Sequence, residues 1–297
     1  MNNLAPFFPV PRDVYTLSKD IDFQAIKPNQ RFVPGFAAQI KLLCLLLFFI
    51  PSAWPQAVSG TAVIAGWNEK EIVVVTDSRS GNITKTYRDD DCKISALSNK
   101  FFIASSRIRK IDGTKNGLRE VFDSHDVARQ AFGRSRAPSA NVVADEWAVM
   151  WAKILNSVKN REQLRDGSGV LFVGLNGNGQ ITVAARWVAL DKEGVFRPFT
   201  PPSSSGIHQG IIFGVAGGMD IVNEFQDSKT PRAKNDIRQW QASMATKRTN
   251  DPYAEYVVQL MRWVIQYTTD SRIGGHPEAI ELRPSGTVKW LQPCQAQ

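Results

Sequence analysis

The sequence contains few of the residues that hold metals. It has three cysteines and three histidines in 297 residues. The histidines show no spacing typical of metal ligands, and Cys92 and Cys294 lie too far apart in the sequence to indicate a metal site. We therefore expect no metal and no cofactor. In an exported protein these two cysteines either form one disulfide, which would join the body of the protein to its C-terminal tail, or remain unpaired thiols.

Charge of one sign is not concentrated anywhere in the chain. The formal net charge is +8, but no run of five or six like charges occurs. Scattered charge of both signs is typical of a solvated surface, so we expect no nucleic-acid partner. Apolar residues make up 43% of the chain and charged residues 22%, which is ordinary for a globular protein with its own core.

Long apolar runs are also missing. The nine consecutive apolar residues 42–50 follow Lys41 and precede Pro51. Nine residues are too few to span a bilayer, but they fit the apolar core of a secretory signal. We predict an N-terminal extension with a signal-peptide-like leader over residues 1–60, and export to the periplasm or the extracellular space. The alternative is an uncleaved leader that anchors the protein to the membrane, which would then be its one membrane contact.

The position of leader cleavage determines which residue becomes the N-terminus. Ala57 and Gly60 both fit the last leader residue, and cleavage after Gly60 gives Thr61 a free α-amine. A threonine hydroxyl is a weak nucleophile, but an adjacent amine with a pKa of about 7.7–8.0 accepts its proton at neutral pH. Asp77 follows Thr61 by sixteen positions, and Lys93 follows Asp77 by sixteen. We interpret this spacing as a hydrolase whose nucleophile is its own N-terminus.

Hydrophobic periodicity after residue 60 predicts strands, two helices, strands, helices and again strands. Antiparallel hairpins flanked by paired helices suggest sheets packed face to face with helices outside. We expect one domain over residues 61–297. The predicted strands are 61–67, 71–76, 92–97, 101–105, 169–175, 181–190, 210–215, 278–282 and 287–291, the helices are 117–132, 139–158 and 252–268, the loop is 198–206, and the polar surface insertion is 228–251.

Three segments, residues 61–66, 72–79 and 92–94, resemble the start of a proteasome β-type subunit, an N-terminal-nucleophile (Ntn) hydrolase. Thr61, Asp77 and Lys93 match that family's register without a gap. Gly60 resembles the glycine at which such precursors (zymogens) cleave themselves, and the element order agrees over the whole chain from residue 61. The resemblance implies an α+β fold, a four-layer αββα sandwich, and a threonine protease or related amidase.

The resemblance also implies a role for each matched residue. Thr61 Oγ would attack a carbonyl, with its own α-amine as general base. The charge of Lys93 would favour the unprotonated amine and the developing alkoxide, and Asp77 would orient Lys93. Asp270 matches the aspartate that positions the amine. The substrate would be a peptide or a small amide, because a fold does not fix its substrate. Family members form rings, so a homo-oligomer is one expectation beside a monomer.

Three positions depart from the family pattern. Arg107 lies in the stretch that replaces a glycine-rich turn, where a backbone N–H forms the oxyanion hole. The N–H survives this change, but the side chain alters space and charge at the pocket. Gly217 and Ile273 stand where the family has serines that help proton transfer. These departures favour an alternative, a protein that kept the fold, lost catalysis and acts in binding or as a structural component.

Overall fold

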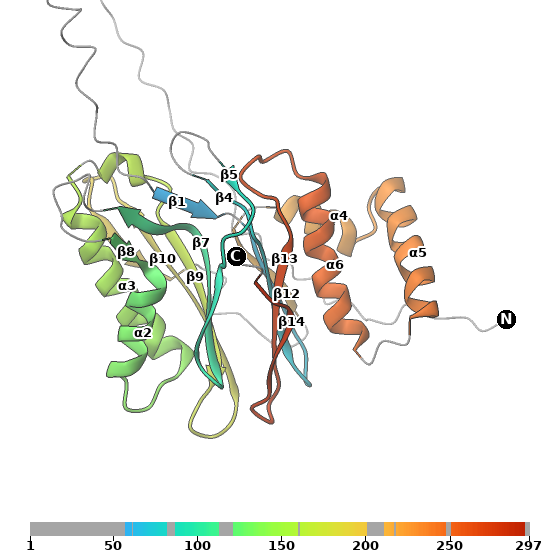
Figure 1. The fold of residues 1–297 in the computed structure, drawn as a ribbon, viewed down its shortest axis with the longest axis horizontal. Coiled ribbons are helices and arrows are strands. Elements are labelled where there is room, and N and C mark those ends of the chain that lie inside the picture. Colours follow the sequence, from blue (N-terminus) through green and yellow to red (C-terminus); the bar gives the residue numbers. More distant parts are fainter. Residues whose placement is uncertain are drawn as a thin grey trace, which may run out of the picture.

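The computed structural model describes a mixed α+β protein with antiparallel sheets (Figure 1). No helix in the part of the chain that it describes is both long enough and apolar enough to cross a bilayer. Two candidate residues, Thr61 and Gly217, lie outside that part, as does the predicted apolar leader core. The described residues are 57–60, 62–81, 87–112, 121–159, 161–200, 211–216, 218–247 and 251–294.

Within the described residues, the larger sheet has nine strands, all paired antiparallel, and seven of them run in the order β11-β10-β9-β7-β1-β4-β5. Strands β6 and β8 both pair with β7 outside this order. The bounds are β1 (Ala57–Gly60), β4 (Ser80–Gly81), β5 (Tyr87–Arg88), β6 (Ile94–Ser98), β7 (Phe101–Asp112), β8 (Val121–Asp123), β9 (Ser168–Leu175), β10 (Ile181–Leu190) and β11 (Phe196–Phe199).

The smaller sheet, as far as the structure describes it, has five antiparallel strands in the order β12-β2-β3-β13-β14. Two predicted hairpins are confirmed in it, β2 with β3 and β13 with β14. In the first turn, the Asn68 side chain accepts the backbone N–H groups of Lys70 and Glu71, a local bond typical of asparagine in turns. The bounds are β2 (Val63–Trp67), β3 (Ile72–Asp77), β12 (Ile211–Ala216), β13 (Pro277–Leu282) and β14 (Val288–Gln292).

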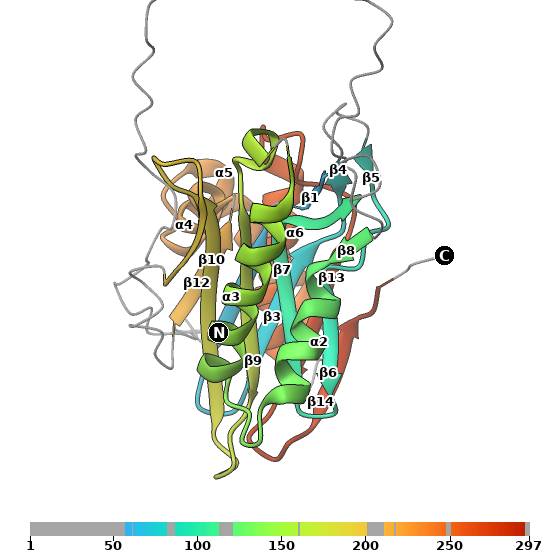
Figure 2. The same ribbon diagram turned by 90° about the vertical axis from the view of Figure 1, so that its left-hand side faces the viewer.

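Helices cover the outer faces of both sheets. In Figure 2, α2 and α3 lie across β6, β7, β9 and β10 of the larger sheet, while α4 and α6 pack on the smaller sheet. Each of the α-helices α2 to α6 begins at a polar cap or a glycine; Ser139, for example, caps α3. The bounds are α2 (Ser124–Arg134), α3 (Ala140–Ser157), the short 3₁₀ helix η2 (Arg161–Leu164), α4 (Met219–Gln226), α5 (Pro231–Thr246) and α6 (Pro252–Tyr267).

Side chains of β7 alternate between the two faces of the larger sheet, so this strand contributes to two hydrophobic cores. Phe101 and Ile103 pack against α2 and α3, whereas Phe102 and Ala104 join a cluster between the two sheets. Successive side chains of a strand point to opposite faces, so a continuous apolar run buries both faces of the sheet. A third cluster lies between the smaller sheet and helices α4 and α6.

Two predicted segments differ in the structure. The helix expected over 117–132 begins only at Ser124, because Asp123 accepts the N–H of His125 and caps it there; the preceding residues Val121–Asp123 form β8. The predicted polar insertion 228–251 contains the helix α5, capped by Thr230 and started by Pro231. Ala233 is the one buried residue of α5, so this helix does lie at the surface.

Candidate active site

The centre of the site is a buried ion pair. Asp77 ends β3, and its Oδ1 accepts a hydrogen bond from Lys93 Nζ at 2.7 Å. The side chains of Asp77 and Lys93 are 0% and 1% exposed. Asp77 Oδ1 also accepts the N–H of Ala62 at 3.0 Å, and Oδ2 accepts the N–H of Gly274 at 3.1 Å. A buried carboxylate thus has the three donors that a charge out of water requires.

The backbone of Lys93 is held from both sheets. Its N–H donates to Glu278 Oε2 at 2.7 Å, and its carbonyl accepts the N–H of Ser105 at 2.9 Å. Glu278 Oε2 also accepts from Thr76 Oγ1 and from the N–H of Ile94. Burial raises the pKa of Glu278 to about 7, against the opposing effect of these hydrogen bonds and of the Lys93 charge.

A buried histidine extends this network on the larger sheet. His125 is fully buried at the start of α2; its Nδ1 lies 2.6 Å from Ser95 Oγ and its Nε2 lies 2.8 Å from Ser105 Oγ. Ser105 Oγ in turn donates to the Lys93 carbonyl at 3.4 Å. Burial, together with the positive charge of Arg109, holds the pKa of His125 well below its usual range. His125 therefore supports the backbone of Lys93 as a neutral imidazole.

The residues before Thr61 form part of the larger sheet. Ala57–Gly60, which the sequence assigns to the leader, form β1 between β7 and β4, with Gly60 opposite Arg107 and Ser59 opposite Gly81. The end of the predicted leader is therefore an inner strand of the described sheet. It also places the predicted cleavage site Gly60 directly beside the predicted pocket residue Arg107.

Arg107 has an unusual backbone conformation within β7. Its φ is +60°, in the left-handed region that glycine favours. Its guanidinium lies 4.6 Å from the centre of the Trp187 ring, and Nη1 donates to the Asp166 carbonyl at 2.8 Å. Burial, with the nearby charge of Arg272, lowers the pKa of Arg107. Strained backbone of this kind is concentrated at functional sites.

Asp270 lies close to the site but is engaged elsewhere. Its carboxylate accepts from Arg272 Nε at 3.0 Å and Nη2 at 2.9 Å. Burial would raise the pKa of Asp270, but the hydrogen bonds from Arg272 outweigh it and lower that pKa. A hydrogen bond joins Lys93 to Asp77, whereas within the described part of the chain the side-chain hydrogen bonds of Asp270 go to Arg272. Ile273 is 2% exposed and packs in the core with α6.

The glycines after Ile273 allow segments to approach closely. A Cβ at Gly274 would lie 2.4 Å from the Arg79 guanidinium carbon, and one at Gly275 would lie 2.3 Å from Ser78 Oγ. Gly275 also has φ +74°. A side chain at Gly274 would displace the Arg79 guanidinium, and one at Gly275 would strain the backbone next to the Gly274 N–H that binds Asp77.

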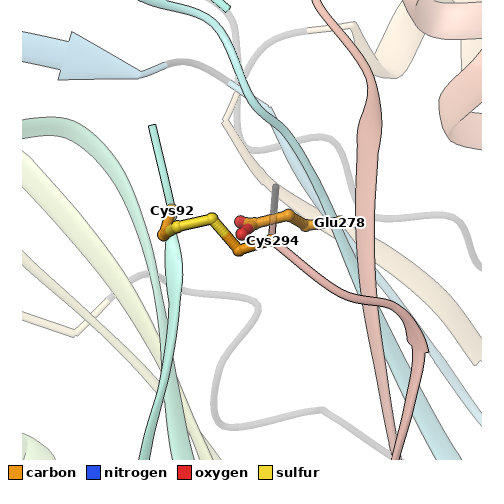
Figure 3. A group of neighbouring side chains, drawn as sticks. All are labelled: Cys92, Glu278 and Cys294. Atoms are coloured by element: carbon orange, nitrogen blue, oxygen red, sulfur yellow. A yellow bond between two sulfur atoms is a disulfide. The ribbon is translucent and has the colours of Figure 1, made fainter. Parts of the chain in front are cut away.

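Cys92 and Cys294 are joined as a disulfide, one of the two states expected from the sequence (Figure 3). Their Cα atoms lie 5.5 Å apart, which is usual for this bond. The bond ties the residue before Lys93 to the tail that follows β14. Figure 3 also shows the Glu278 carboxylate beside the two sulfurs.

The sequence prediction missed the supporting residues Glu278, Ser105 and His125. Glu278 did carry one signal, an acidic residue within a mostly apolar strand that also contains Glu281, because such residues are rarely buried without partners. A scan against protein-family models and a search of the curated proteins found no match.

Breaking the central ion pair should be costly. Asp77→Asn and Lys93→Met should each lower the free energy of unfolding by about 3–5 kcal/mol, because either change leaves an unpaired buried charge. The decrease in the free energy of unfolding of the double variant should be smaller, by at least ~1 kcal/mol, than the sum of the decreases in the two single variants. Urea unfolding measures these values, and additive losses would contradict the pair. The exposed pair Asp126–Arg129 serves as control, with an expected effect within about 0.5 kcal/mol for Arg129→Ala.

Burial of neutral His125 should make the fold acid-sensitive. Because its folded-state pKa lies below the unfolded value, the unfolded chain takes up the proton first, and stability is lost as the pH falls below about 6.5. The loss is at most about 1.4 kcal/mol per pH unit. In His125→Gln this contribution should disappear. The difference in the free energy of unfolding between wild type and variant should therefore change between pH 6.5 and 5 and stay constant between pH 7.5 and 9. Parallel curves throughout would refute this role.

Proposed function

We propose that this chain is an exported threonine-type Ntn hydrolase with Thr61 as N-terminal nucleophile after cleavage of the Gly60–Thr61 bond. One observation carries the proposal: Asp77 Oδ1 accepts both the ammonium of Lys93 and the N–H of Ala62. Because Ala62 directly follows Thr61, the buried pair is held one residue from the proposed N-terminus.

The proposal also includes a specific layered fold. A four-layer αββα sandwich of the Ntn type is supported by the three core clusters, one between the sheets and one beneath the helices on each outer face. The order of elements along the chain also agrees with this assignment.

The proposed reaction needs no group from outside the chain except water. The α-amine of Thr61 takes the hydroxyl proton while Oγ attacks the substrate carbonyl, and the ammonium then gives this proton to the leaving nitrogen as the C–N bond breaks. Water, deprotonated by the same amine, hydrolyses the resulting ester and restores the hydroxyl. The charge of Lys93 stabilises the alkoxide and disfavours protonation of the amine. Asp77 balances that charge.

The position of β1 favours a peptide over a small amide as substrate. The four residues before the cleaved bond lie extended between β7 and β4. Once they are released, the acyl side of a peptide can add as a strand in the same place, with backbone hydrogen bonds to both neighbours. The left-handed backbone at Arg107 lies opposite the last residue of this strand, where an oxyanion donor is needed.

A binding or structural protein without catalysis is the second candidate. Ile273 provides no hydroxyl and is committed to the core. The guanidinium of Arg107 is stacked on Trp187 of β10 and bound to the Asp166 carbonyl before β9, so this side chain is already engaged in contacts within the protein. The buried position of Ile273 and the contacts of Arg107 are the features that favour a protein without catalysis.

Substitution of the nucleophile separates the two candidates. Thr61→Ala should lower peptide hydrolysis by roughly 10⁴-fold, because the attacking oxygen is removed, whereas Thr61→Ser should keep measurable turnover. A fluorogenic peptide library, assayed beside a panel of small amides, measures this. Thr246→Ala, on the exposed end of α5, is the matched control and should leave the rate unchanged. Equal activity in wild type and Thr61→Ala would refute the proposal.

A further inference from the structure

The disulfide lies against a buried carboxylate that is only half satisfied. Glu278 is 0% exposed. Its Oε2 accepts three hydrogen bonds, from Thr76, Lys93 and Ile94, whereas Oε1 has no hydrogen-bond partner among the described residues. A buried acceptor left without a partner is destabilising. Such an atom requires an explanation, and Figure 3 shows the carboxylate of Glu278 beside the sulfurs of Cys92 and Cys294.

These three residues come from separate segments and converge on one point. Cys92 precedes β6, Glu278 lies on β13, and Cys294 follows β14. The two Sγ atoms and a carboxylate oxygen all lie within 4.8 Å of one another. Two thiolates and one carboxylate form a donor set that zinc accepts, with a water molecule in the fourth tetrahedral position.

We propose that, when the disulfide is reduced, Cys92, Cys294 and Glu278 bind a divalent metal ion of the Zn²⁺ type. A dithiol reductant supplies two electrons and two protons to the S–S bond and becomes a disulfide itself. Metal binding then displaces the proton of each thiol, so two thiolates and the Glu278 carboxylate balance the ion and leave the site with a charge of −1. The disulfide and the metal are mutually exclusive states of the same two cysteines.

The geometry allows this exchange with little movement of the backbone. Two Zn–S bonds of about 2.3 Å at a tetrahedral angle place the sulfurs about 3.8 Å apart. Cysteines whose Cα atoms are 5.5 Å apart reach this separation by rotation about χ1. Glu278 Oε1 then gains the cationic partner that it lacks, while Oε2 keeps its three donors. The sequence spacing predicted no such site, because the three ligands are far apart along the chain.

Cobalt provides the direct test, since Co²⁺ occupies zinc sites and thiolate ligation gives it an intense near-ultraviolet charge-transfer band. The full chain, reduced with a non-metal-binding phosphine under argon, should bind one Co²⁺ with this band, and Zn²⁺ should abolish the band. The oxidised protein should bind none. Cys294→Ser and Cys92→Ser should each weaken binding by about tenfold or more, and Glu278→Gln by about tenfold with the band retained.

Cys44→Ser, made in the uncleaved chain that still contains this residue, is the matched control, because Cys44 is the one other cysteine of the sequence; this variant should bind Co²⁺ like wild type. Reduced protein without the band, or undiminished binding in Cys294→Ser, would overturn the proposal. If Glu278→Gln binds as tightly as wild type, the carboxylate is not a ligand and the proposed donor set is wrong. None of these readouts depends on hydrolytic activity, so they remain decisive whatever reaction the chain catalyses.

Discussion

The buried ion pair of Asp77 and Lys93 is the interaction on which the rest of the site depends. An uncompensated charge in the interior costs several kcal/mol, so the fold has to supply an opposite charge or hydrogen-bond partners for each member of the pair. Asp77 receives donors from three separate segments: Ala62 at the start of the chain's core, Lys93 before β6, and Gly274 before β13. The pair therefore couples the region next to Thr61 to both ends of the domain.

The position of Lys93 shows how two sheets cooperate. Ser105 of β7 holds its carbonyl from the larger sheet, and Glu278 of β13 holds its N–H from the smaller one. The disulfide of the adjacent Cys92 adds a covalent link to the tail beyond β14. The ammonium of a flexible side chain is thus kept in place by a backbone that cannot shift without breaking bonds in both sheets. Such support from neighbouring residues is what the proposed catalytic role of Lys93 would require.

Local pattern predicts the hairpins, the helix α3 and the spacing of Asp77 and Lys93 because each of these arises within a short stretch of chain. Contacts between distant residues leave no such pattern. Glu278 reaches Thr76 across 202 positions, and His125 contacts Ser105 only after α2 has packed on β7. Likewise, the sequence pattern assigns Ala57–Gly60 to the leader. Their strand structure depends on partners on β4 and β7, which the local pattern does not reveal. Fold class was therefore more predictable than the environment of the site.

The most direct test of the central claim is the N-terminal residue of the mature protein. The proposed chemistry requires a free α-amine on Thr61, whether a signal peptidase or the chain itself cleaves the bond. Intact-mass measurement of the protein purified from an exporting host, combined with N-terminal sequencing, should show a chain that begins at Thr61. A mature chain that begins at any other residue, or that retains Gly60, would contradict the assignment of Thr61 as the nucleophile.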